Sequence, residues 1–306
     1  MNQVELLEMN SKQLKDKFKE IGYFASEEVA LAVKNALILH KPILIEGPPG
    51  VGKTELAKAL STILNKEMIR LQCTPEITER KAIYEFDYVK QLLFIQAFKE
   101  DLNSELSGMS LKDKISQLNQ NNPFYSEDFL IKRPLLKAFQ SETGSKVLLI
   151  DEIDKSDEEF EYSLLEPLSD YTLSIPELGT VVAKEKPITI ITSNRRRKIS
   201  DTLLRRCLYL YVGYPTLEEE VEIIVSKVNI DQKLAIRIVE MIQKIRDEKN
   251  LTQYPSIAET IEWAEMINIQ MTGETELQKI MAQNIFIVAK NPSDREKMLK
   301  VLKENN

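Results

Sequence analysis

A short glycine-rich stretch contains the residue types needed to hold a polyphosphate. It fits the pattern G-x-x-x-x-G-K-[ST] and consists of Gly47, Pro48, Pro49, Gly50, Val51, Gly52, Lys53 and Thr54. Glycines let backbone N–H groups approach phosphate oxygens, and a helix beginning near Lys53 directs its positive end towards them. We expect Lys53 to contact the β- and γ-phosphates of ATP and the Thr54 hydroxyl to bind Mg²⁺.

Two adjacent carboxylates, Asp151 and Glu152, follow residues 146–150, which have the pattern of a buried strand. Ligands of open α/β sheets bind at the carboxyl ends of the strands. Asp151 is therefore expected to hold the metal ion, directly or through water, and Glu152 to orient and deprotonate the attacking water. The alternative interpretation is a solvated acidic loop after an ordinary core strand.

A third apolar run, residues 188–192, ends at Ser193 and Asn194. The Asn194 amide is placed to position the lytic water between Glu152 and the γ-phosphate. Alternatively, Asn194 only starts a turn, as asparagine often does. The catalytic interpretation predicts that three strand ends converge on one phosphate.

The elements that must position these groups have an α/β pattern. Segments with the pattern of short strands occur at residues 42–45, 68–73, 146–150, 188–192 and 208–212. Helical segments separate them, and residues 11–39 also have a helical pattern, which indicates a five-stranded parallel sheet in an αβα sandwich. Helical patterns then follow at residues 216–228, 231–248, 256–271 and 274–289. We expect a sandwich domain over residues 1–212 and a small all-helical domain over residues 213–306, with Trp263 in its core.

Two segments are longer than a minimal nucleotide-binding sandwich requires. Residues 75–130 include an amphipathic stretch at 92–95 and a polar run at 117–122. Residues 172–184 have the pattern of a hairpin. A basic run at residues 195–198 indicates either a subunit contact or a solvated charge cluster.

The order of these motifs resembles that of an AAA+ ATPase. Residues 203–207 (Leu-Leu-Arg-Arg-Cys) belong to the same order, and details at 151–156, 175–179 and 255–260 resemble the CoxD-type members of the MoxR-like branch. The resemblance covers about residues 20–270. It implies a P-loop αβα sandwich followed by a helical lid domain, with insertions that face a central pore or a client. The alternative is that these insertions only cover the surface of the ring.

The resemblance also implies roles for individual residues. Asn194 matches sensor 1, and Arg206 matches the arginine finger that points at the nucleotide of the neighbouring subunit. Arg205 is the alternative finger because the two arginines are adjacent, and a surface pair at a helix end is the interpretation without the resemblance. Ala258 stands where many lids carry the sensor-2 arginine, so no sensor-2 residue is assigned.

The function implied is Mg²⁺-dependent ATP hydrolysis in a ring, with a hexamer as the expected form. MoxR-like ATPases resemble remodelling chaperones for metalloenzymes or other complexes, often with a partner that bears a von Willebrand A domain. Two other classes stay open: a nucleic-acid-linked motor or loader, and a non-hydrolysing scaffold. The presence of Lys53, Asp151, Glu152 and Asn194 together argues against the scaffold.

Composition agrees with this interpretation. The net charge of −7 over 306 residues argues against nonspecific nucleic-acid binding. Two cysteines, Cys73 and Cys207, cannot form a disulfide framework, and we expect both to be buried in a reducing cytoplasm. No apolar run reaches membrane-spanning length, and the lone His40 is expected to be structural or exposed.

Overall fold

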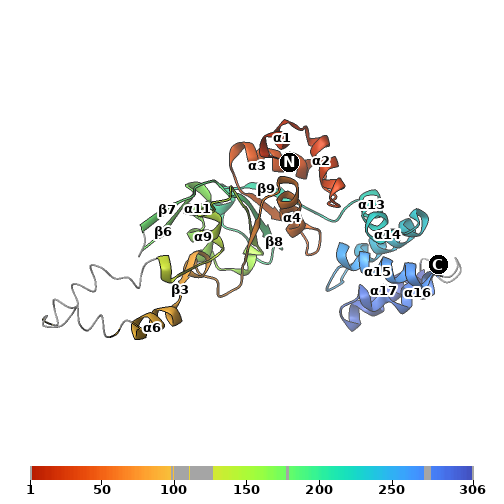
Figure 1. The fold of residues 1–306 in the computed structure, drawn as a ribbon. Helices are drawn as coiled ribbons and strands as arrows, with labels where there is room; N and C mark the ends of the chain where they lie inside the picture. The colour runs from red at the N-terminus through yellow and green to blue at the C-terminus, as the bar shows by residue number, and fades with distance from the viewer. Residues whose placement is uncertain are drawn as a thin grey trace.

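The computed structural model describes residues 2–97, 99, 110, 127–176, 179–271 and 277–304. A sheet covered by helices is followed by a helical bundle (Figure 1). The sheet has five parallel strands in the order β2-β5-β8-β1-β9. These strands are β1 (Ile43–Glu46), β2 (Met68–Gln72), β5 (Val147–Asp151), β8 (Ile188–Ser193) and β9 (Leu208–Tyr211). The predicted five-stranded parallel sheet and helical C-terminal region are confirmed.

Both faces of the central strands β5, β8 and β1 are buried, which explains why these strands are nearly continuous apolar runs, whereas the outer strands β2 and β9 alternate between buried and exposed residues. Ile43 and Ile45 face one core, whereas Leu44 and Leu148 face the other. The first core is closed by α1 (Gln3–Glu8), α2 (Ser11–Glu20), α3 (Glu27–Leu39) and α4 (Lys53–Leu64). The second is closed by α5 (Glu79–Ile83), α9 (Pro134–Phe139), α10 (Glu158–Ser163), α11 (Leu165–Ser169) and α12 (Asp201–Leu204).

The amino-terminal helical region is divided, where the sequence predicted one helical stretch over residues 11–39. Gly22 has a left-handed φ of 77°, which ends α2, and the Ser26 side chain then accepts a hydrogen bond from the Val29 N–H at the start of α3. His40 ends α3 in the left-handed conformation with an exposed side chain. A glycine followed by a capping serine was the overlooked signal.

The strand register shows which residues lie at the carboxyl ends of the parallel strands and which lie at their amino ends. Glu46, Asp151 and Ser193 are the last residues of β1, β5 and β8, so they lie at the same edge of the sheet. Ile43 at the start of β1 pairs with Leu208 at the start of β9. Residues that precede Leu208 therefore lie at the opposite edge from the loop that follows β1.

The first predicted insertion contains a small antiparallel sheet of β3 (Tyr84–Phe86) and β4 (Leu130–Lys132). Between them lie α6 (Tyr88–Ala97) and a short 3-10 helix, η2 (Glu127–Phe129). Of the predicted amphipathic stretch at residues 92–95, Phe94 packs partly buried against the core, whereas Leu92 and Leu93 are each 60% exposed. The predicted polar run at residues 117–122 lies outside the described residues.

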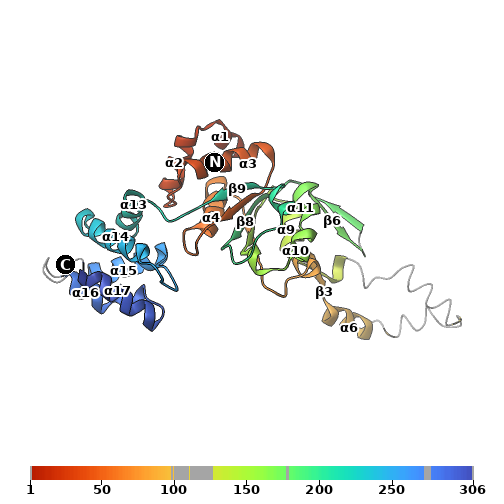
Figure 2. The same cartoon turned by 180° about the vertical axis from the view of Figure 1, so that it is seen from behind.

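The second predicted insertion is a hairpin, as expected. β6 (Thr172–Ile175) pairs antiparallel with β7 (Gly179–Val182). Residues 177–178 of its turn lie outside the described residues. In Figures 1 and 2, α6 and the helical bundle lie at opposite ends of the molecule.

The helical bundle, which we call the lid, has its own core around the fully buried Trp263. Its helices are α13 (Leu217–Val228), α14 (Gln232–Asp247), α15 (Ile257–Gln270), α16 (Leu277–Gln283) and α17 (Pro292–Glu304), with the 3-10 turn η5 (Ile285–Ile287). The sequence did not predict α17, and the predicted last helix over residues 274–289 is shorter. Within the described part of the chain, no helix is both long and apolar enough to cross a bilayer. Cys73 and Cys207 are buried and free, and burial raises the pKa of each thiol to about 12.

Candidate functional site

The phosphate loop, residues 47–54, joins β1 to α4. Gly50 and Gly52 have left-handed φ angles of 77° and 92°, which glycine adopts without a steric cost. Gly52 is the residue before α4, so the first free N–H groups of this helix face the loop. The Lys53 ammonium donates to the carbonyl oxygens of Gly47 at 2.9 Å and of Pro48 at 2.6 Å. The loop is thus folded around its own lysine.

Lys53 is a buried cation, with an exposed fraction of 7%. Burial lowers its pKa from 10.5 to about 8, and the nearby carboxylates of Asp154, Asp151 and Glu152 oppose this shift. The side chain is therefore still charged near neutral pH. A buried ammonium at the start of a helix is a strong attractant for phosphate oxygens.

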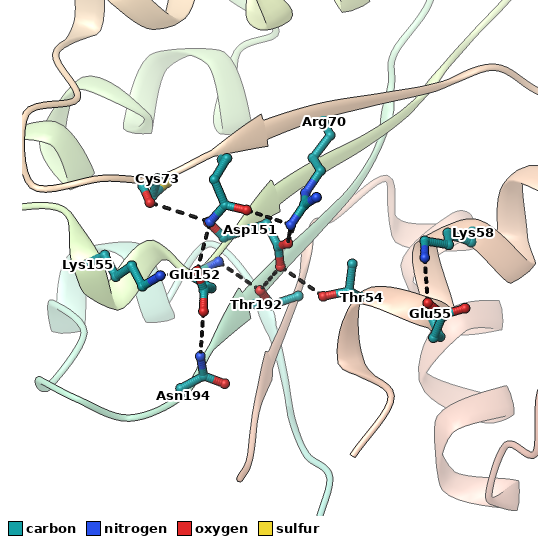
Figure 3. A network of polar contacts seen from close by, with 11 residues as sticks. Thr54, Glu55, Lys58, Arg70, Cys73, Asp151, Glu152, Lys155, Thr192 and Asn194 are labelled. Carbon is teal, nitrogen blue, oxygen red and sulfur yellow. Dashed lines mark hydrogen bonds and ion pairs between the residues drawn. The ribbon is translucent and has the colours of Figure 1, made fainter. Parts of the chain in front are cut away.

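Asp151 accepts hydrogen bonds on both carboxylate oxygens (Figure 3). Its Oδ1 accepts from the Thr54 hydroxyl at 3.0 Å and the Thr192 hydroxyl at 2.6 Å. Its Oδ2 accepts from Arg70 Nε at 3.0 Å and forms an ion pair with the same guanidinium. These bonds fix a carboxylate that is only 2% exposed.

The Thr54 and Asp151 oxygens fit a magnesium ion. Both are hard oxygen donors, and Mg²⁺ is usually bound through one or two carboxylates together with water and substrate phosphates. The described residues contain no group of three or more His, Cys, Asp or Glu that could enclose a metal ion. A site made of one hydroxyl and one carboxylate, completed by phosphate oxygens, agrees with that finding.

Glu152 lies beside Asp151 in the left-handed conformation, with φ 57°. Its Oε1 accepts from the Asn194 side-chain amide at 3.0 Å, and its Oε2 accepts from Gln72 Nε2 at 2.9 Å and pairs with Lys155. The backbone N–H of Glu152 donates to the Thr192 hydroxyl at 2.9 Å. The structure thus brings Glu152 and Asn194 together, and their catalytic roles stay predictions.

Three residues of this cluster were missed from the sequence. Arg70 and Gln72 belong to β2, and Thr192 belongs to β8. Gln72 pairs in register with Asp151, so β2 delivers polar side chains directly beside the carboxylates. Arg70-x-Gln72 is an alternating polar pair at the end of a strand, but its relevance requires knowing that β2 neighbours β5.

Asp154 is a further buried carboxylate, 5% exposed, that the sequence did not single out. Its Oδ2 accepts from the backbone N–H of Arg196 at 3.0 Å. Its Oδ1 is buried and has no hydrogen-bond partner within the described ranges. This negative charge helps to keep Lys53 protonated.

Comparison with known proteins defines the family. Residues 42–207, which are more than half of the chain, match the family described as AAA domain (dynein-related subfamily). The chain belongs to this AAA family. The match spans the phosphate loop, the two adjacent carboxylates and Asn194. Nucleotide binding is the property that the family supports for this site.

Individual proteins are similar at lower identity. The YeaC protein of Bacillus subtilis (strain 168) is 21% identical over 265 residues, which cover 75% of this chain and 67% of YeaC. The RuvB Holliday junction branch migration motor of Thermotoga maritima aligns with a TM-score of 0.44 and 16% identity, over 97% of this chain and 73% of RuvB. A point mutant of the same RuvB gives a TM-score of 0.46 at 16% identity, over 97% of this chain and 72% of the mutant.

The two candidate finger arginines of this AAA domain have different environments. Arg206 donates from Nε to the Ser169 hydroxyl at 2.7 Å and from Nη1 to the Thr202 carbonyl at 3.0 Å. The Arg205 side chain is exposed and forms no hydrogen bond or ion pair with any residue that the structure describes. Both arginines precede β9, at the opposite edge of the sheet from the phosphate loop.

The basic run at residues 195–198 is not a uniformly solvated cluster. Arg197 pairs with Glu161, which is fully buried, and donates from Nε to the Ser156 carbonyl at 2.7 Å. Arg195 lies 3.7 Å from Glu46. Arg197 therefore ties the segment after Asn194 to the segment after Glu152.

Proposed function

We propose that this AAA domain protein is a Mg²⁺-dependent ATPase of the MoxR-like branch, CoxD type, which remodels or matures a protein partner. The observation that carries the proposal is the position of the Glu152 carboxylate. It is held between Asn194, which follows β8, and Gln72 at the end of β2. Asp151 and Thr54, the candidate metal ligands, are beside it.

The chain's own residues divide the work. The phosphate loop and Lys53 bind the triphosphate, while Thr54 and Asp151 hold Mg²⁺, which neutralises phosphate charge when bound. Glu152 accepts the proton of the attacking water, and Asn194 orients that water against the γ-phosphate. Contacts to Asn194 and Gln72 keep the carboxylate aimed during the reaction.

The arginines support an oligomer. Arg205 and Arg206 lie at the sheet edge away from their own phosphate loop, so neither is placed to reach its own nucleotide. We infer that one of them completes the site of a neighbouring copy in a ring, with a hexamer as the expected form. Arg206 matches the family motif, whereas the free side chain of Arg205 keeps it as the alternative.

The partner assignment rests on the MoxR-like motifs, and two structural features support it. Residues 1–212 and 213–306 form a sandwich and a lid that can move against each other during turnover. Apolar side chains of α6 are exposed at the far end of the molecule, where a client can reach them. The client is a protein, with a von Willebrand A domain protein as the candidate adaptor, and the cytoplasm is the proposed location.

Replacing the base while keeping its shape tests the ATPase proposal. Glu152→Gln should still bind ATP but hydrolyse it at least about 10²-fold more slowly. Glu159→Gln is the matched control, because Glu159 is exposed on α10 and lies outside the site. Nucleotide binding and phosphate release are measured on the same preparations. Near-normal turnover by the Glu152 variant removes this residue from the role of base.

Mixing two inactive variants tests whether an arginine of one copy completes the ATPase site of its neighbour. Arg205→Ala and Arg206→Ala are each mixed with Glu152→Gln, so that intact bases meet intact arginines at mixed interfaces. The finger variant should be inactive alone, by about 10³-fold or more, and recover some activity in the mixture. Absence of recovery with both variants argues against action across subunits. The Glu152→Gln protein with ATP is also the form in which to capture the client.

A further inference from the structure

Two segments near the boundary between the sandwich and the lid touch the phosphate loop. The first is the linker, residues 212–216, which leads into the lid. A Cβ atom added to Gly47 would lie 1.9 Å from the Val212 carbonyl oxygen. The second is the start of α15, since a Cβ added to Gly50 would lie 2.3 Å from Ser256 Cβ. Both glycines are therefore sites of close contact, in addition to their role in the turn.

One buried arginine of the lid connects these two segments. Arg246 on α14 lies 4.3 Å from the ring centroid of Tyr214 in the linker. Its Nε donates to the Pro255 carbonyl, directly before Ser256, at 2.9 Å. A guanidinium that stacks on one segment and hydrogen-bonds to the other fixes their separation.

The remaining donors of Arg246 fix the guanidinium itself. Its Nη1 and Nη2 donate to the two oxygens of Glu220 on α13, at 2.7 and 2.9 Å. Nη2 also lies 3.2 Å from the Thr260 hydroxyl on α15. The Arg246 and Glu220 side chains are only 7% and 0% exposed, so this two-pronged pair cannot rearrange without opening the lid core.

We propose that Arg246 is a positioning residue that couples the lid to the phosphate loop, by holding the start of α15, with Ser256 against Gly50, at a fixed distance from Tyr214 of the linker. This inference rests on the proposed function, because the loop that it positions is the nucleotide site. The coupling passes through the close packing of Ser256 on the Gly50 backbone. It gives the lid a way to respond to the loop although Ala258 carries no charge at the sensor-2 position.

The loop side of the coupling is tested without nucleotide. Glu259 and Thr260 donate their amides to the Ser256 hydroxyl and carbonyl, so hydrogen exchange at these amides reports on the start of α15. Gly50→Ala should push Ser256 away and accelerate exchange there by at least about fivefold. Gly52→Ala is the matched control, because Gly52 has the same left-handed geometry but its added Cβ would meet only Tyr23, at 3.8 Å. Equal exchange in the two variants overturns the proposal.

The lid side is tested with a conservative change. Arg246→Lys keeps the charge but cannot make the two-pronged bond and the Pro255 contact together. It should accelerate exchange at Glu259 and Thr260 and weaken ATP binding by at least about fivefold. Arg237→Lys, at an exposed position of the same helix, should change neither. If Arg246→Lys accelerates hydrogen exchange at Glu259 and Thr260 but leaves the affinity for ATP unchanged, Arg246 stabilises the lid only and the proposed coupling is refuted. A wild-type protein that binds no ATP would refute the proposed function, whereas the Gly50 comparison would still decide the coupling.

Discussion

Two arginine–carboxylate pairs, one in each half of the molecule, differ in their exposure to solvent. In the sandwich, the side chain of Asp151 is 3% exposed and the side chain of its partner Arg70 is 51% exposed. In the lid, Glu220 and Arg246 are 0% and 7% exposed. The first pair joins a buried acid to a cation that water can reach, whereas both charges of the second pair are removed from solvent.

This difference in exposure makes the Arg70–Asp151 pair an exchangeable contact and the Arg246–Glu220 pair a permanent one. Arg70 can leave Asp151 at a lower cost, because its own charge is hydrated and the Thr54 and Thr192 hydroxyls still donate to the carboxylate, so another cation can take its place. Arg246 cannot leave Glu220 without stranding a buried charge. The sandwich pair thus suits a site that binds and releases a metal ion, and the lid pair suits a rigid contact between two helices.

The largest expected effect comes from breaking the permanent pair. Glu220→Ala should lower the free energy of unfolding by about 3–5 kcal/mol, because Arg246 would be left buried without its counter-charge. Glu218→Ala, at an exposed position of the same helix, should change it by less than about 1 kcal/mol. Chemical denaturation followed by circular dichroism measures both. Equal losses for the two variants would refute the contrast.

A change in the exchangeable Arg70–Asp151 pair should affect Mg²⁺ binding more than the stability of the fold. Asp151→Asn keeps the shape but removes the ligand charge, so the Mg²⁺ concentration that gives half-maximal turnover should rise by about 10- to 100-fold. Asp157→Asn is a suitable control, because Asp157 caps α10 and asparagine caps a helix equally well. A Mg²⁺ titration of ATPase activity compares them. An unchanged Mg²⁺ requirement in Asp151→Asn excludes this carboxylate as a ligand.

Lys53 is another buried cation, held by carbonyls rather than by a carboxylate, and its pKa should be observable as a titration. Its folded pKa of about 8 lies below the ordinary 10.5, so the folded state releases this proton before the unfolded state does. Above about pH 8 the affinity for ATP should fall by up to about tenfold per pH unit, as the ammonium is lost.

Deprotonation of Lys53 affects the stability of the fold in the opposite direction from the affinity for ATP. Between the folded and unfolded pKa values, the unfolded chain binds more protons, so this group makes folding more favourable as the pH rises. ATP binding measured with a chelator present, so that no metal contributes, gives the first trend. An affinity that stays constant well above pH 8 would mean that Lys53 keeps an ordinary pKa.

The smallest expected effect is the removal of the exposed partner. Arg70→Ala should lower the free energy of unfolding by about 1–2 kcal/mol, less than Glu220→Ala, because the Thr54 and Thr192 hydroxyls still donate to the buried Asp151. Because it removes a competing cation from Asp151, the Mg²⁺ requirement should fall slightly, opposite in direction to Asp151→Asn. Denaturation and the same Mg²⁺ titration test both statements. A large loss of stability would make the two pairs alike.

The sequence predicted the sandwich side of this comparison well. The strand, the glycine loop and the helix are consecutive in the sequence. Asp151, Glu152 and Asn194 each follow a segment with a strand pattern, so local pattern alone predicted that they gather at the edge formed by the carboxyl ends of the strands. Arg70 and Gln72 were not predicted, because their relevance depends on the order of strands. That order is a property of the whole fold.

The lid side could not be predicted in the same way. Glu220 is the third of three consecutive glutamates near the start of α13, which has the pattern of a solvated acidic turn. Arg246 is 26 residues away on the next helix, and the contact depends on how the two helices cross. The approach of Ser256 to Gly50 is likewise a tertiary contact without a local signal. Periodicity predicted the first four helices of the lid, but neither α17 nor the polar contacts between the helices.

The left-handed backbone at Glu152 has a consequence for the protein's evolution. Residues with a Cβ atom are at a disadvantage in this conformation, and glycine is not. Glu152→Gly should therefore relax the main chain while it abolishes the chemistry, so an inactive descendant of this chain would gain robustness by losing its reactive group. Persistence of an acid at this position in natural variants would accordingly indicate selection for turnover itself, against the preference of the fold.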